Sequence, residues 1–189
     1  MDVLLLIASG LWVIVPALVP NPGAVIFGGG RPVDLGREWK GARILGDGKT
    51  WNGLIGGICF GILIGGLQIL GEINYSHYLP GFIGLGPMPT ALGAVATLAV
   101  GSLLGDMGGA FIKRRRGMSR GQKAPILDQY DSIIGALLLT MLVFPDWTLS
   151  TLVLGDAWVS LLAVIVAAPL LHRSVNIIGY KAGLKKEPW

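Results

Sequence analysis

The sequence is poor in the residues that build disulfide frameworks and zinc sites. Among 189 residues it has one cysteine, Cys59, and two histidines, His77 and His172. A single cysteine excludes an intrachain disulfide, and two histidines so far apart do not suggest a zinc site. Because Cys59 lies inside an apolar run, we expect a buried and unreactive thiol there.

Charged residues are also scarce, at 14% of the chain, whereas 52% of residues are hydrophobic and the mean hydropathy is +0.66. This composition is outside the usual range of a soluble domain. The fifteen lysines and arginines fall into three segments, separated by long stretches without positive charge: Arg31, Arg37, Lys40, Arg43 and Lys49; then Lys113, Arg114, Arg115, Arg116, Arg120 and Lys123; and finally Arg173, Lys181, Lys185 and Lys186. Lysine and arginine are retained in cytoplasmic loops, so the pattern predicts a polytopic membrane protein.

Five apolar runs approach the ~20 residues needed to cross a bilayer. They cover about residues 3–19, 54–70, 89–112, 132–144 and 149–171, and we expect the fourth to begin earlier, near Asp128. The first should end at Pro20-Asn21-Pro22 and should be retained, because no positive segment precedes it. The sequence therefore predicts one all-α membrane domain over residues 1–189, a bundle of about five transmembrane helices. Its N-terminus would lie outside and its C-terminus in the cytoplasm, with large cytoplasmic loops after the first and third helices.

Glycines and charges place further constraints. Gly57, Gly61 and Gly65 recur every fourth residue, a spacing that favours close helix packing in lipid and is compatible with a homodimer face. The glycine-rich residues 21–53 suggest an ordered or partly re-entrant loop, and residues 145–148 an outer loop. The net charge of +4 belongs to loops beside anionic headgroups, so we expect binding to the lipid bilayer and none to nucleic acid.

Ionisable residues within membrane spans are costly and favour a functional role. Asp106 lies about six residues from the end of the third run, roughly 9 Å below it at the helical rise. Asp128 and Asp131 share a helix face if the fourth helix has begun. Three carboxylates at one depth would suit Mg²⁺. The alternatives are that a neighbouring cation neutralises Asp106 and that Asp128 or Asp131 only caps a helix. Asp156 suggests no more than a hydrogen bond between helices.

Cations accompany these acids. Lys113 lies two turns after Asp106 on nearly the same face, where it could hold a polyphosphate, whereas Arg115 and Arg116 are interpreted as topology anchors. Residues 43–53 resemble a P-loop, but Arg43 stands where glycine is required and no strand precedes it, which argues against a nucleoside triphosphatase. Glycines beside Lys49 and Thr50 can still offer backbone N–H groups to phosphate. The alternative is a turn that caps the second helix through Thr50 or Asn52.

Several of these residues resemble the signature of CTP-dependent phosphatidate cytidylyltransferases. The matching residues are Gly105-Asp106, Lys113-Arg114, Gly117 and Leu127-Asp128-Gln129-Tyr130-Asp131-Ser132. The chain departs from that signature in a shorter loop, with Ser119-Arg120 in place of a Lys-Asp pair and no loop histidine. The short loop and the element Arg43-Ile44-Leu45-Gly46-Asp47-Gly48-Lys49-Thr50-Trp51 resemble the archaeal CDP-archaeol synthases, and this likeness covers nearly the whole chain.

The resemblance implies transfer of CMP from CTP to an unsaturated isoprenoid diether glycerol phosphate lipid, giving CDP-archaeol and pyrophosphate for membrane lipid synthesis. It implies Mg²⁺, as one ion or a pair, and an active site at the cytoplasmic face of the cell membrane. We assign Asp106, Asp128 and Asp131 to the metal and, with Lys113, to catalysis. The expected CTP and phosphate contacts are Arg43, Gly46, Asp47, Gly48, Lys49, Thr50, Lys113 and Arg114.

Two alternatives fit the sequence less well. A CDP-alcohol phosphotransferase needs an Asp-Gly-x-x-Ala-Arg motif and later acids four residues apart, and neither Asp47-Gly48-Lys49-Thr50-Trp51-Asn52 nor the Asp128/Asp131 pair satisfies this. A small transporter could use Asp106 as an ion site. Transporter sites usually lie near the bilayer midplane and often come with structural repeats. Here the acids cluster toward one face.

Overall fold

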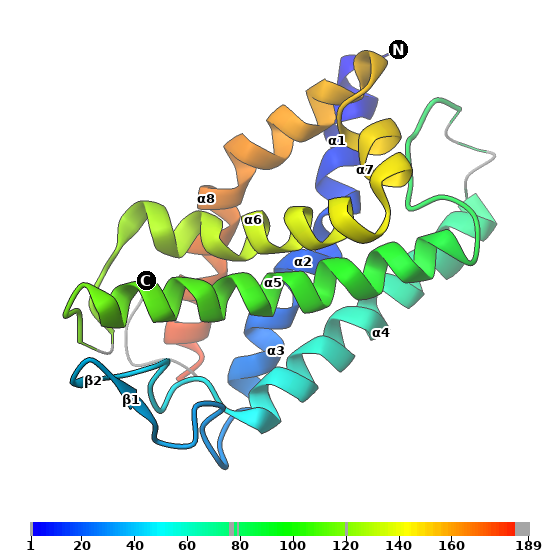
Figure 1. The fold of residues 1–189 in the computed structure, drawn as a ribbon. Coiled ribbons are helices and arrows are strands. Elements are labelled where there is room, and N and C mark those ends of the chain that lie inside the picture. Colours follow the sequence, from blue (N-terminus) through cyan, green and yellow to red (C-terminus); the bar gives the residue numbers. More distant parts are fainter. Residues whose placement is uncertain (1, 76–77, 79, 120, 184–189) are drawn as a thin grey trace.

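The computed structural model describes residues 2–75, 78, 80–119 and 121–183, and these are mostly helical (Figure 1). Four predicted positions, His77, Arg120, Lys185 and Lys186, lie outside the described residues. The elements in chain order are α1 (Val3–Val13), α2 (Val15–Leu18), α3 (Pro20–Ile26), β1 (Glu38–Trp39), β2 (Ala42–Arg43), α4 (Trp51–Tyr75), α5 (Thr90–Arg115), α6 (Pro125–Val143), α7 (Pro145–Leu152), the 3₁₀ turn η2 (Gly155–Ala157) and α8 (Trp158–Lys181).

Five stretches of the described chain are long and apolar enough to cross a membrane, which confirms the predicted all-α membrane bundle. The first stretch, Val3–Ile26, combines α1, α2 and α3. The prediction that it ends at Pro20 is therefore wrong. Pro16 and Pro20 occupy the first or second positions of α2 and α3, where a missing N–H costs no helical hydrogen bond. The prolines divide the span without ending it.

The remaining boundaries differ in detail. Helices α4 and α5 are longer than their apolar runs, and α6 begins at Pro125, before Asp128, as expected. The predicted outer loop at residues 145–148 is instead the start of α7, so the fifth span begins later, at Gly155. Proline and Asp146 in the first turn suit a helix start. Asp156 lies exposed in η2 at the beginning of the last span.

Close packing of small residues holds the bundle together around α5, which lies side by side with α6 (Figure 1). Gly57, Gly61 and Gly65 face α5 and the prolines and alanines of the first span. A Cβ added at Gly65 would lie 2.3 Å from Cγ1 of Val95. The predicted close packing is confirmed. This face is used within the chain, so it is not free to form the homodimer face that its spacing allowed.

The opposite face of α4 is apolar and exposed. Ile55, Cys59 and Leu63 are four residues apart, and all three are exposed. The expectation of a buried thiol at Cys59 is therefore wrong. A continuous apolar run does not reveal which side of the helix faces lipid, because lipid and protein interior are equally apolar.

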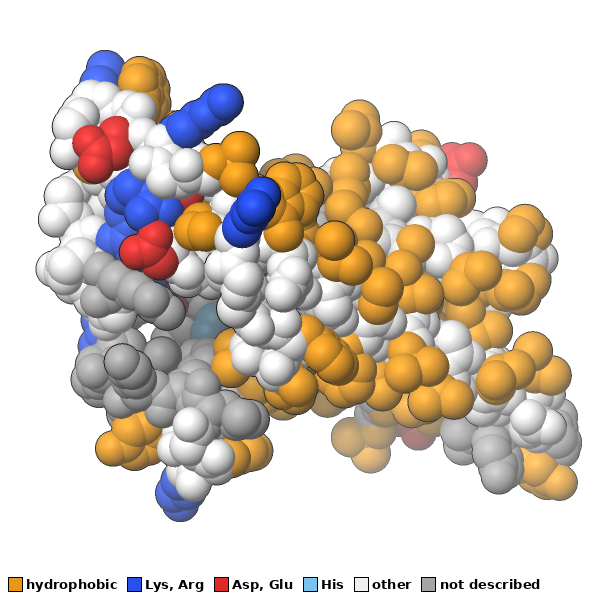
Figure 2. Space-filling model, turned by 90° about the horizontal axis from the view of Figure 1, so that it is seen from below, with side chains coloured by type: hydrophobic (Ala, Val, Ile, Leu, Met, Phe, Trp, Pro, Cys, Tyr) orange, Lys and Arg blue, Asp and Glu red, His pale blue; other side chains and the backbone are white. Residues whose placement is uncertain are grey.

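Loops and basic residues gather at one end of the bundle, which we call the basic end. Here α3, α5 and α8 finish and α4 and α6 begin, joined by residues 27–50 and 116–124. Strands β1 and β2 form a short antiparallel hairpin within the first of these loops. Seen from below, charged side chains cluster at this end, and hydrophobic side chains predominate over the rest of the face in view (Figure 2). The loop after the first span is thus ordered, as expected.

Candidate active site

A cavity of about 820 Å³ opens at the basic end of the bundle. Its walls come from α2 to α6, from α8 and from the loop before α4. All three predicted acids, Asp106 of α5 and Asp128 and Asp131 of α6, line it together with Lys49 and Lys113. The structure therefore brings the carboxylates of two neighbouring helices and a lysine of a distant loop to one hollow.

Two ion pairs cross the walls of this cavity. The Lys49 ammonium contacts Oδ2 of Asp106, and the Lys113 ammonium contacts Oδ1 of Asp128. Each of the four side chains is 20–26% exposed, so they can be reached from the cavity. The alternative that a cation neutralises Asp106 is observed in this arrangement. Ammonium groups on flexible stems are able to exchange one anionic partner for another.

Asp131 is held differently, by hydrogen bonds rather than by a lysine. Its Oδ1 accepts from the backbone N–H of Ser132 at 2.6 Å and from the Ser132 hydroxyl at 3.2 Å. The Ser132 hydroxyl in turn accepts from Nδ2 of Asn21 on α3 at 2.7 Å. Asn21 also lines the cavity. Sequence reasoning missed it, although an amide side chain between two prolines of an apolar span was an available signal.

Glycines of α5 make room for Asp131. A Cβ at Gly105 would lie 2.1 Å from the Asp131 carbonyl oxygen, and one at Gly109 would lie 2.1 Å from its Oδ2. A Cβ at Gly108 would meet nothing within 4 Å. Gly105 and Gly109 therefore set the approach of α6 and the position of the carboxylate.

A smaller pocket of about 170 Å³ adjoins the cavity. It shares Lys49, Asp106, Lys113 and Asp131 with the larger hollow and adds Arg114. Three cations around so small a volume form a suitable place for a polyphosphate, because charge-assisted hydrogen bonds to phosphate are strong.

The loop that carries Lys49 is built around Asp34, a residue not singled out from the sequence. Its buried carboxylate accepts from the Arg43 guanidinium at 2.6 Å and from the N–H groups of Leu45 and Gly46, both at 2.9 Å. Desolvation alone would raise the pKa of Asp34, but these hydrogen bonds hold it well below its ordinary value. The carboxylate is thus ionised and fixes the turn before Lys49. The sequence feature that could have identified Asp34 is an acid within a basic, glycine-rich loop.

The predicted nucleotide contacts divide into two groups. Asp47, Gly48, Lys49 and Thr50 line the cavity, whereas Arg43 and Gly46 are not among its lining residues. Arg43 donates to both Asp34 and Asp47, and these contacts hold the loop together. The Thr50 hydroxyl accepts from the N–H of Gly53 at 3.2 Å. Thr50 therefore caps α4, as the alternative interpretation proposed, and also borders the cavity.

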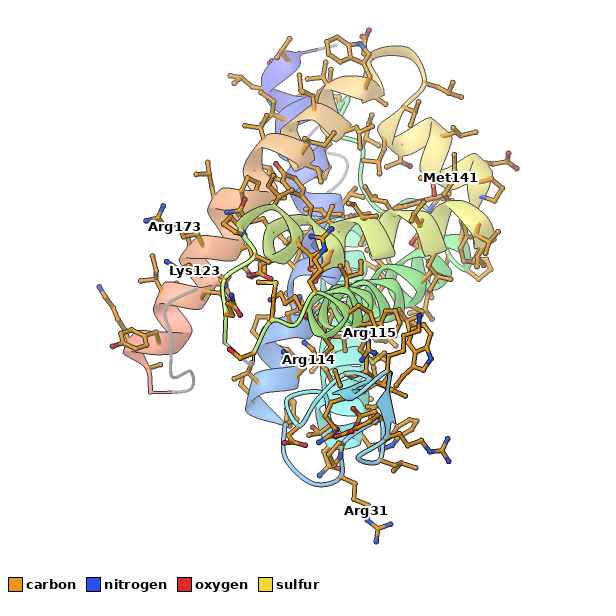
Figure 3. All side chains as sticks on the ribbon, turned by 60° about the vertical axis from the view of Figure 1, so that its left-hand side comes forward. Arg31, Arg114, Arg115, Lys123, Met141 and Arg173 are labelled. Carbon is orange, nitrogen blue, oxygen red and sulfur yellow. The ribbon has the colours of Figure 1, made fainter. Side chains whose placement is uncertain are left out.

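Arginines at the end of α5 tie this loop to the bundle (Figure 3). Arg114 donates to the carbonyls of Leu45, at 3.4 Å, and of Met118. Arg115 donates to the carbonyls of Ala42 and Arg43 at 2.9 and 2.7 Å. The topology-anchor interpretation of Arg115 was therefore incomplete, because its side chain also clamps the β1–β2 hairpin. Arg116 is exposed.

The cavity offers carboxylate oxygens that could bind a metal, but they are not already arranged around one point as a metal site. Among the described residues, no group of three or more acidic, histidine or cysteine side chains forms a ready-made metal site. Of the three acids predicted to bind metal, Asp106 and Asp128 are paired with lysines instead. Magnesium is usually bound through one or two carboxylates with substrate phosphates and water completing its shell, so this donor set fits a metal that arrives with a nucleotide.

Asp34→Asn is expected to destabilise the protein by about 2 kcal/mol, because it weakens the buried group that accepts hydrogen bonds from the charged Arg43 guanidinium. Thermal unfolding in detergent checks this result. Since the pKa of Asp34 is depressed, its stabilising contribution is complete above its unfolded-state value of about 3.9 and is lost only as pH falls through the lower folded-state pKa. The matched control is Asp47→Asn, whose 66% exposed carboxylate contacts the same arginine and should contribute at most about 1 kcal/mol. Equal effects of the two changes would contradict the central position of Asp34.

Comparison with known proteins agrees with the geometry. The family model described as CarS-like, CDP-archaeol synthase, matches residues 3–189. The chain belongs to the CDP-archaeol synthase family. CDP-archaeol synthases of Methanospirillum hungatei and Methanoregula boonei are 51% and 48% identical to it, over 92% and 93% of this chain and 99% of each relative. That of Halorubrum lacusprofundi is 43% identical over 97% of this chain and 98% of its own.

A solved structure supports the same assignment. It is described as an intramembrane enzyme for archaeal membrane lipids biosynthesis, and it has a TM-score of 0.57 and 33% sequence identity to this chain. The match covers 83% of this chain and 90% of the solved one. The resemblance to CDP-archaeol synthases seen in the sequence is thus confirmed, and the chain is an integral membrane enzyme, a cytidylyltransferase of membrane lipid synthesis.

Proposed function

We propose that this member of the CDP-archaeol synthase family joins CTP to an unsaturated diether glycerol phosphate lipid, forming CDP-archaeol and releasing pyrophosphate. The observation that carries the proposal is the cavity at the basic end. Four aspartates and two lysines lie on its polar walls, while Ala168, Leu171 and Val175 of α8 contribute apolar surface. One hollow can therefore accept a polar headgroup and the start of an apolar tail.

The reaction itself needs little covalent help from the protein. A phosphomonoester is largely dianionic near neutral pH, since its second pKa is ~6. One of its oxygens attacks the α-phosphorus of CTP, a new P–O bond forms, and the bond to the pyrophosphate oxygen breaks. The barrier comes from repulsion between anions and from charge that builds on the departing pyrophosphate. Positioning and electrostatic stabilisation lower such barriers.

The side chains of the cavity can supply both positioning and electrostatic stabilisation. Lys49, Lys113 and Arg114 would hold the triphosphate in the smaller pocket, and Lys49 and Lys113 would leave their aspartates to do so. Asp106 and Asp128 would then be free, with Asp131, to bind Mg²⁺, as one ion or a pair. The metal would neutralise phosphate charge when bound. Asn21 and Ser132 keep Asp131 oriented toward the cavity.

We place this site at the cytoplasmic face, because lysine and arginine residues gather at the basic end. CTP is available there, and the lipid would enter with its tails still between the helices.

Incubation of the purified protein with labelled CTP, Mg²⁺ and a diether glycerol phosphate should yield labelled CDP-lipid and one pyrophosphate per product. A parallel reaction with a diacyl glycerol phosphate tests the preference for ether lipids. Consumption of a CDP-lipid with an alcohol acceptor, without use of CTP, would instead support a CDP-alcohol phosphotransferase and overturn the proposal. The acids lie at one end of the bundle rather than at its midplane, which disfavours the transporter alternative.

A further inference from the structure

We propose that residues 31–40, called here the surface turn, lie on the headgroup layer of the membrane and bind anionic lipid headgroups. The surface turn includes β1 and connects through β2 to the loop that carries Lys49. Of residues 31–40 only Val33 lines the cavity, and lipid contact by the exposed side chains of this segment does not depend on the reaction assigned above.

An apolar side chain of the surface turn, Leu35, is left largely uncovered by the described chain. Leu35 is 60% exposed and has a φ of 51°, a left-handed conformation that bulky residues rarely adopt. Hydrogen bonds of the turn, from Leu35 N–H to the Pro32 carbonyl and from Arg37 N–H to the Asp34 carbonyl, keep it there. The fold thus presents a leucine outward at a conformational cost.

Trp39 places the surface turn beside a membrane span. Its ring stacks on Phe111 of α5, with centroids 5.7 Å apart and planes inclined by 12°, yet it remains 49% exposed. Phe111 neighbours Ile112, and Leu104 lies two turns earlier on the same side; both are exposed apolar residues of a membrane-spanning helix. Trp39 therefore lies beside the last turns of that span, where tryptophan is enriched at membrane–water interfaces.

The charges of the surface turn favour lipids with anionic headgroups over neutral ones. Arg31, Arg37 and Lys40 are exposed, and Figure 3 shows Arg31 directed away from the protein. Against them stands one exposed acid, Glu38, because the carboxylate of Asp34 is buried against Arg43. Each lysine or arginine near an anionic membrane surface raises affinity for it about fivefold. Exposed apolar groups flanked by unbalanced cations match an anionic headgroup layer better than a neutral one.

The test uses the whole protein in lipid nanodiscs with a fluorophore at one position. Cys59→Ser removes the only native cysteine, and Leu35→Cys then provides the attachment site. Lipids spin-labelled near the headgroup should quench this fluorophore strongly in discs that contain phosphatidylglycerol and weakly in phosphatidylcholine alone. Adding Arg37→Gln and Lys40→Gln should weaken binding to the anionic surface about thirtyfold and remove the difference between the two lipids.

The control places the fluorophore at Glu38→Cys, a strand neighbour whose side chain points to the other face from Trp39. Quenching there should be weak in both lipids. Equal quenching at positions 35 and 38, or equal quenching of position 35 in the two lipids, would overturn the proposal. Energy transfer between two labelled chains without lipid quenching would also overturn it and would indicate a second copy of the chain on this surface.

Discussion

Asp106→Asn is expected to lower the turnover of CTP by about a hundred- to a thousandfold, the loss that follows removal of one preorganised electrostatic group. Asparagine keeps the shape of the side chain but loses the charge that contacts Lys49 and faces both the cavity and the smaller pocket. The protein should still fold, because the side chain is partly exposed and Lys49 can reach solvent. The rate of CDP-lipid formation, measured beside a thermal unfolding curve in detergent, checks both statements.

The control for this change is Asp146→Asn. Asp146 is exposed in the first turn of α7, away from the cavity, and its replacement should leave turnover within about twofold of the unmodified enzyme, since surface changes of this kind are usually small. Full activity of Asp106→Asn would remove Asp106 from the proposed metal and phosphate site. If Asp106→Asn did not fold, Lys49→Met would be studied in its place, because it breaks the same ion pair and leaves the carboxylate intact.

Gly109→Ala is expected to reduce turnover roughly a hundredfold, a typical cost of misplacing a catalytic group by about 1 Å. The new Cβ would lie 2.1 Å from Oδ2 of Asp131, so the carboxylate must rotate away. Stability should change by about 1 kcal/mol or less, because alanine favours the helix by about that amount and so offsets the small shift that Cγ and Cβ of Asp131, at 2.9 and 3.1 Å from the new Cβ, require. Steady-state kinetics with a thermal unfolding curve separates the two effects.

Two neighbouring glycines make this experiment selective. At Gly105 the added Cβ would meet the backbone of α6, at 2.1 Å from the Asp131 carbonyl oxygen. Gly105→Ala should therefore destabilise the bundle by about 1–3 kcal/mol, as overpacking does. Gly108→Ala points into open space and should change neither activity nor stability adversely. If Gly108→Ala were as damaging as Gly109→Ala, the effect would be one of the helix and not of Asp131.

Much of the candidate site could be predicted because its chemistry is unusual for its surroundings. Asp106 stands out as a charge in an apolar span, and Asp128 and Asp131 stand out at the start of another. Arg43 shows the limit of this reasoning. Its place in a glycine-rich loop predicts a phosphate ligand, but in the folded protein its guanidinium donates to Asp34 and Asp47.

The sequence by itself determined that the chain is a helical membrane protein with its cations at one end, because apolar length and the distribution of charge are local properties. It also determined the residue types of the site. Tertiary structure decided which residues meet. Lys49 and Asp106, 57 residues apart, contact one another because the loop before α4 folds onto α5, against which α4 packs closely through its glycines. The same packing turned Cys59 outward and Gly57 inward, since lipid and protein interior place almost the same demand on an apolar side chain, and only the neighbouring helices distinguish the two.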